Sequence, residues 1–169
     1  MALDYHGLSE RYRPSKIETL LVGEAPPPSG DKYFYYPKEM NPDRSIRGYP
    51  SLPATIFYHH FQRIPQSIGE YKELLSELQK KGIFLIDILD EPIRVRDRVY
   101  PKQVNPVHLR RIIDTIPKLR GKMKDRGIKV NDENIIFLDP GHGYERYVSM
   151  EFPLSKIVKW VDYRMSAEV

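Results

Sequence analysis

Three short runs that are rich in apolar residues stand out along the chain. They span residues 17–22, 83–89 and 134–139, and each run is followed by or ends in glycine, aspartate or proline. A short, continuous apolar run is typical of a strand that is covered on both faces of a sheet. Each run is therefore expected to be a buried strand that leads into a functional loop.

Segments with helical spacing of apolar residues separate these runs. One helix is expected from its N-cap Ser67 to about Lys81, because its apolar residues recur on one face. A second helix is expected to begin at Asn105 and Pro106, since proline is favoured in a first turn. Pro117 is expected to break or kink this second helix.

A last helix is expected over residues 155–165. Buried strands that alternate with helices predict an α/β fold, as a three-layer α/β/α sandwich around a central, mainly parallel sheet of about four strands. The three apolar runs are expected to be neighbouring parallel strands. No repeat or Gly/Ser-rich linker divides the 169 residues, so a single α/β domain over residues 1–169 is expected. Ligands bind at the carboxyl ends of the strands in such sheets.

The loop after the first run reads Gly-Glu-Ala-Pro-Pro-Pro over residues 23–28. It matches neither a dinucleotide-binding fingerprint nor a phosphate-binding loop. Three consecutive prolines lack backbone N–H groups, which leaves the amides of Glu24 and Ala25 free to face a ligand. Four aromatic residues follow at positions 33–36. They are expected either to cap the core or to stack on a ligand.

Residues 20–26, Leu-Leu-Val-Gly-Glu-Ala-Pro, resemble the first strand and motif of the Gly-Glu-Ala-Pro branch of the uracil-DNA glycosylase superfamily. The resemblance implies a uracil-DNA glycosylase-like fold and hydrolysis of the N-glycosidic bond of a flipped, deaminated base in DNA. Pro27 replaces a glycine of that branch, and the four cysteines of its iron–sulfur cluster are absent. The residues that the resemblance places beside the base are Gly23, Ala25, Pro26, Phe34 and, as the alternative stacking ring, Tyr35.

The three loops supply three candidate catalytic residues, Glu24, Asp87 and His142. The resembled branch carries an asparagine near the position of Asp87, where a carboxylate could pair with a base, orient a water molecule or simply cap the loop. His142 lies between two glycines and is expected either to stabilise the departing base or to be a turn residue. The superfamily's late histidine lies in a His-Pro-Ser motif, whereas residues 152–155 read Phe-Pro-Leu-Ser.

Arg94, Arg96 and Arg98 alternate with other residues and are expected to lie on one side of an extended segment. They could follow the phosphates of single-stranded or damaged duplex DNA, or protect an edge strand from pairing. The net charge of +4 and the isoelectric point of about 9.1 are compatible with a nucleic-acid partner.

The absence of cysteine excludes disulfides, thiolate zinc sites and iron–sulfur clusters. No spacing of histidine and acidic residues typical of zinc occurs, so neither a metal nor another cofactor is expected. The sequence contains no apolar run long enough to span a bilayer and no visible secretory signal, which favours the cytoplasm and argues against a membrane partner.

Three functions are compatible with these observations. A DNA glycosylase-like enzyme is preferred. The alternative is a non-catalytic nucleic-acid or nucleotide-binding protein on the same fold, which would use stacking and arginines. An unrelated α/β enzyme for a small phosphorylated substrate is disfavoured, because the sequence lacks a glycine-rich phosphate loop.

Overall fold

A four-stranded, all-parallel sheet forms the centre of the protein in a computed structural model that describes residues 3–27, 33–35, 52–92 and 105–159. The strand order is β2-β1-β3-β4, so the three apolar runs are neighbouring parallel strands as predicted. The strands are β1 (Thr19–Gly23), β2 (Ile83–Asp87), β3 (Ile135–Asp139) and β4 (Lys156–Lys159).

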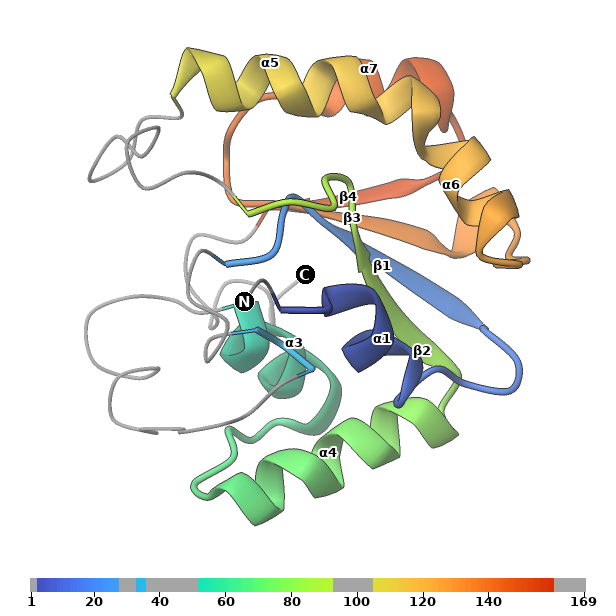
Figure 1. Cartoon of the computed structure of the whole chain (residues 1–169). Helices are drawn as coiled ribbons and strands as arrows, with labels where there is room; N and C mark the ends of the chain where they lie inside the picture. The colour runs from blue at the N-terminus through green and yellow to red at the C-terminus, as the bar shows by residue number, and fades with distance from the viewer. Residues whose placement is uncertain (1–2, 28–32, 36–51, 93–104, 160–169) are drawn as a thin grey trace.

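Helices cover both faces of this sheet. Figure 1 shows α5, α6 and α7 on one side and α1, α3 and α4 on the other, which confirms the three-layer α/β/α sandwich. The helices are α1 (Tyr5–Glu10), α3 (Leu52–Phe61), α4 (Ile68–Lys80), α5 (Pro106–Thr115), α6 (Leu119–Asp125) and α7 (Glu145–Glu151). Two 3₁₀ helices are η3 (Ile116–Lys118) and η4 (Asp132–Asn134).

The predicted helix starts are confirmed by their capping bonds. The Ser67 hydroxyl accepts a hydrogen bond from the Glu70 amide at 3.1 Å, and the Asn105 side chain accepts one from the Val107 amide at 2.8 Å. These bonds satisfy amides that have no partner within the helix. Pro117 lies in η3, between α5 and α6, and therefore interrupts the helix as expected.

The prediction of a helix over residues 155–165 is wrong. Residues 156–159 form β4, in which Ile157 pairs with Phe137 of β3, and the residues after 159 lie outside the described part of the chain. Pairing with β3 satisfies the backbone groups of a short segment that contains β-branched residues, which suit a strand. The Phe-Pro-Leu-Ser stretch at 152–155 accordingly links α7 to β4 and does not begin a helix.

The core consists of the buried faces of the sheet and an aromatic cluster beneath it. Phe34 stacks on Phe57 with 5.5 Å between ring centroids, and the Tyr71 hydroxyl donates to the Phe34 carbonyl at 2.7 Å. Tyr35 is anchored in the same layer, where its hydroxyl accepts a hydrogen bond from the Leu85 amide. Among the described helices, none combines the length and the apolar character needed to cross a membrane.

The strand order marks one position at the carboxyl ends of the strands. The chain leaves β1 toward β2 on one side, whereas it leaves β3 toward β4 on the opposite side. Where neighbouring parallel strands send their connections in opposite directions, a ligand-binding crevice forms outside their carboxyl ends. In this protein that position lies between the ends of β1 and β3.

Candidate functional site

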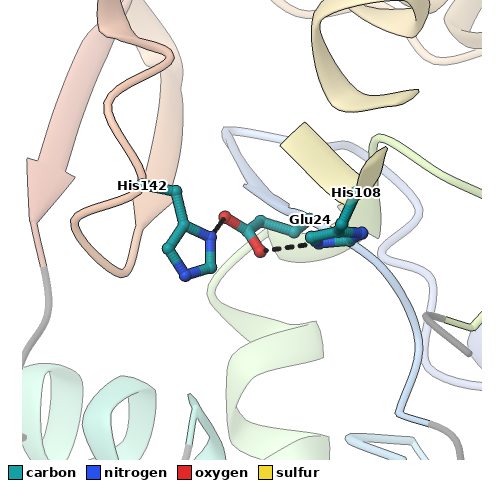
Figure 2. A group of neighbouring side chains, drawn as sticks. All are labelled: Glu24, His108 and His142. Carbon is teal, nitrogen blue, oxygen red and sulfur yellow. Dashed lines mark hydrogen bonds and ion pairs between the residues drawn. The ribbon is translucent and has the colours of Figure 1, made fainter. Parts of the chain in front are cut away.

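Glu24 lies on the β1 side of this position. It directly follows β1, and its carbonyl accepts a hydrogen bond from the Leu89 amide at 2.9 Å, which ties the loops after β1 and β2 together. Its side chain is 13% exposed. Figure 2 shows the carboxylate between two histidine rings: Oε1 lies 2.5 Å from Nδ1 of His142, and Oε2 lies 3.3 Å from Nε2 of His108.

His142 reaches Glu24 from the loop after β3 because of the local sequence Asp-Pro-Gly-His-Gly. The Asp139 carboxylate accepts hydrogen bonds from the Gly141 amide at 2.9 Å and the His142 amide at 2.7 Å. Gly141 and Gly143 have φ angles of +93° and +82°, a region in which other residues are strained. Asp139 and the two glycines therefore fix the turn that presents the imidazole to Glu24.

His108 completes the cluster and was missed by the sequence analysis. It lies in the first turn of α5, and only 3% of its side chain is exposed. Its position follows from the N-cap Asn105 and from Pro106, which set where α5 begins. The Nδ1 atom of His108 has no hydrogen-bond partner among the described residues, so Nε2 is the ring atom that contacts Glu24.

The electrostatics of the cluster favour a charged Glu24 and a charged His142. Burial alone would raise the pKa of Glu24, but the hydrogen bonds from His108 and His142 hold it below its ordinary value. Burial would likewise lower the pKa of His142, but its hydrogen bond to Glu24 and the charge of that carboxylate raise it overall. The pair is therefore stabilised as a carboxylate and an imidazolium.

Asp87, the third candidate catalytic residue, lies close to Gly23 but faces a different space. It lines a cavity of about 440 Å³ together with Pro26, Tyr33, Lys122 and other residues, and neither Glu24 nor His142 is among the described residues of that lining. Burial raises the pKa of Asp87 to about 7, since the nearby Lys122 only partly offsets it and Glu24 adds to it. Asp87 is therefore a carboxyl group that changes charge near neutral pH.

The structure does not bring the residues expected beside the base together in one place. Phe34 and Tyr35 are each only 4% exposed and pack in the core, so the structure places neither ring where a base could stack on it. Gly23 is buried against Asp87, Pro26 lines the cavity of Asp87, and Ala25 is partly buried. Arg94, Arg96 and Arg98 lie outside the described residues.

The site therefore combines two predicted residues, Glu24 and His142, with one that the sequence did not reveal. Together with His108 they place one carboxylate oxygen and two imidazole nitrogens within 4.8 Å of one another, a donor set that could also hold a metal ion. Comparisons with protein-family models, curated proteins and solved structures find no match to this chain.

Proposed function

We propose that the protein hydrolyses the N-glycosidic bond of a deaminated base in DNA, with Glu24 and His142 as its catalytic residues. The observation that carries this proposal is the 2.5 Å contact between these side chains at the carboxyl ends of β1 and β3. The Gly-Glu-Ala-Pro stretch that resembles the glycosylase motif supports it, because this stretch supplies Glu24 at the carboxyl end of β1.

The reaction requires opposite charges on the two sides of the bond. When the bond between C1′ and the base nitrogen breaks, its electron pair leaves with the base and the sugar becomes cationic. A protonated His142 can donate from Nε2, which points away from Glu24 in Figure 2, to the departing base. The Glu24 carboxylate can stabilise the sugar cation and take a proton from the water that adds to C1′.

His108 contributes by orienting Glu24. Each carboxylate oxygen has two lone pairs, so an oxygen that accepts a hydrogen bond from a histidine can accept another from water. With Oε2 held by His108 and Oε1 by His142, the plane of the carboxylate is fixed from both sides. Such preorganisation lowers the cost of reaching the transition state.

The non-catalytic alternative relies on stacking and on arginines. The rings expected to stack in either function, Phe34 and Tyr35, are buried, and Arg94, Arg96 and Arg98 lie outside the described residues. No other observation among the described residues favours binding without chemistry, so hydrolysis is the function that the site supports best.

The proposal is tested by alkaline strand scission of oligonucleotides that contain uracil, hypoxanthine or xanthine, as single strands and as duplexes. We expect release of the base by the wild-type protein, and a loss of about 10²–10⁴-fold in the rate for Glu24→Gln and for His142→Ala. Glu73→Gln is the matched control, because Glu73 is exposed on α4. No abasic site at stoichiometric protein, with the fold intact by circular dichroism, would overturn the proposal.

A further inference from the structure

The three side chains of the candidate site form a donor set of a kind that proteins use for transition metals. Glu24, His108 and His142 come from the loop after β1, from α5 and from the loop after β3, so their meeting is a property of the tertiary fold. Neither their sequence spacing nor a shared element brings them together. Two imidazoles and one carboxylate, with a further position open, are the ligands of many catalytic zinc and iron sites.

We infer that Glu24, His108 and His142 bind one divalent transition-metal ion, of which Zn²⁺ is the best representative. Imidazole nitrogens favour zinc and related ions over Mg²⁺ and Ca²⁺, which prefer oxygen ligands. The inference goes beyond the proposed function, because it concerns binding in the absence of any substrate.

The distances support such a site after a small movement. One donor atom from each residue lies within 4.8 Å of the others, and the two recorded contacts with Glu24 are 2.5 and 3.3 Å. A tetrahedral zinc ion with bonds of about 2.1 Å holds its ligand atoms about 3.4 Å apart. Binding of an ion therefore requires the ligand atoms to shift by on the order of 1 Å. The loop that carries His142 is best suited to move, because glycines flank that residue.

Burial and partners show why an ion would be held here. The only polar contact recorded for the His108 ring is with Glu24, and Nδ1 of that ring has no partner among the described residues. An ion would replace the proton on Nε2, and the ring proton would move to Nδ1. It would also replace hydrogen bonds by stronger metal–ligand bonds at a carboxylate that is already shielded from water.

His142 leaves room for a further ligand. Its side chain is 24% exposed, whereas that of His108 is 3% exposed, so the open coordination position lies on the His142 side of the cluster. A water molecule bound there would be more acidic than bulk water. The ion would occupy the same donor atoms that the proposed hydrolysis uses, so binding and hydrolysis must be measured separately.

The test is calorimetric titration of untagged, EDTA-treated protein with ZnCl₂. We expect the wild type to bind one Zn²⁺ per chain. The affinity should be more than about tenfold weaker in His142→Ala and in Glu24→Gln, because losing a residue that only hydrogen-bonds to a metal ligand already weakens metal binding about tenfold. His6→Ala is the matched control, because His6 faces Glu10 at 3.7 Å on the exposed surface of α1. This substitution should leave the affinity unchanged.

A measurement on the wild-type protein avoids any effect of substitutions on folding. Nitrogen-15 NMR of the imidazoles should show zinc on Nε2 of His108 and on Nδ1 of His142. Absence of binding, or shifts confined to His6, His59 and His60, would overturn the inference. Either outcome would leave the proposed hydrolysis standing, because release of a base from oligonucleotides can be measured separately with EDTA added.

Discussion

Glu24 is the residue on which the candidate site depends, because its two oxygens contact histidines from two distant parts of the chain. A buried carboxylate without partners would be costly, and two hydrogen-bonded imidazoles offset that cost. Asp87 lies nearby, no hydrogen bond to its carboxyl group is recorded among the described residues, and burial is the largest influence on its pKa. The two carboxyl groups therefore differ in charge near neutral pH.

Asp87→Asn should stabilise the protein increasingly as the pH rises from 5 to about 7, and by a constant amount above that. The folded pKa of Asp87 is about 7, above its ordinary value of 3.8, so the folded state retains a proton that the unfolded chain has lost. Between these values the wild type loses up to about 1.4 kcal/mol of stability per pH unit from this group, and it loses no more above pH 7. The asparagine variant has no such loss.

The measurement is urea unfolding of both proteins at several pH values. The charged groups that face Asp87, namely Lys122, Arg126, Glu24 and Asp90, are common to both, so the difference isolates Asp87. A difference in the free energy of unfolding that stays constant from pH 5 to pH 8 would show that the carboxyl is not perturbed in this way.

Gly23→Ala should destabilise the protein by about 1–3 kcal/mol, the usual cost of forcing extra volume into a packed site. A Cβ atom at position 23 would lie 2.6 Å from Oδ1 of Asp87, so the carboxyl group of Asp87 must move. Gly121→Ala is the control, because no atom lies within 4 Å of its added Cβ and alanine favours the helix α6. Equal effects in thermal unfolding would contradict the close approach of the Asp87 carboxyl to Gly23.

At the residue scale, the sequence could predict Glu24 and His142 because both directly follow strands in loops with distinctive residues. His108 could not be predicted, since it lies on a helix 84 positions from Glu24 and resembles an ordinary amphipathic position. Phe34 and Tyr35 were ambiguous, because an aromatic run fits a core or a binding platform equally well. Only the packing of Phe34 on Phe57 and the bond between Tyr35 and Leu85 decides between the two.

At the element scale, the loop after β3 determines where His142 points. Asp139 is fully buried and accepts two backbone amides of this loop, while the flanking glycines adopt positive φ angles. The sequence Asp-Pro-Gly-His-Gly already indicates a turn of this kind. It does not indicate the partner of the imidazole, because that partner comes from another strand.

Asp139→Ala should cost about 1–3 kcal/mol, because two amides of the loop lose their acceptor. It should also release His142 from Glu24, which the NMR chemical shifts of the His142 ring would report. Ser67→Ala removes a comparable cap at the start of α4 and should cost about 1 kcal/mol without affecting His142. An unchanged His142 spectrum in Asp139→Ala would mean that the loop is held by other contacts.

The other elements show which parts of the fold apolar periodicity and capping residues can predict. The strands β1, β2 and β3 and the helices α4 and α5 were predictable from apolar periodicity and from the caps Ser67 and Asn105. The β4 strand was not, because Ile157 and Val158 are spaced equally well for a helix. Its conformation depends on the free edge of β3, which is a tertiary feature.

At the scale of the whole molecule, the strand order places the site. The connections after β1 and β3 leave in opposite directions, and Glu24 and His142, which follow these two strands, meet between their carboxyl ends. The sequence predicted neighbouring parallel strands and loops at their carboxyl ends. It could not predict that β1 lies between β2 and β3, and this order is what separates Asp87 from the Glu24–His142 pair.

Binding to a uracil-containing single strand should weaken steeply as salt rises, because cations that contact phosphates release counterions. Fluorescence anisotropy at several salt concentrations gives the slope, and replacing Arg94, Arg96 and Arg98 by alanine should reduce it by about 2 if each contacts one phosphate. The matched control is the triple alanine variant of Lys16, Lys124 and Lys129. These residues line one cavity, together with residues that precede β1 and β3. Absence of binding even at low salt would contradict a nucleic-acid partner.

The contact between Glu24 and His142 is the central claim, and NMR titration of the His142 ring in metal-free protein tests it most directly. The hydrogen bond and the charge of Glu24 raise the pKa of His142 against the effect of burial. In Glu24→Gln the pKa of His142 should therefore fall below its wild-type value, while Glu73→Gln should leave it unchanged. The same His142 pKa in the wild type and in Glu24→Gln would contradict the account.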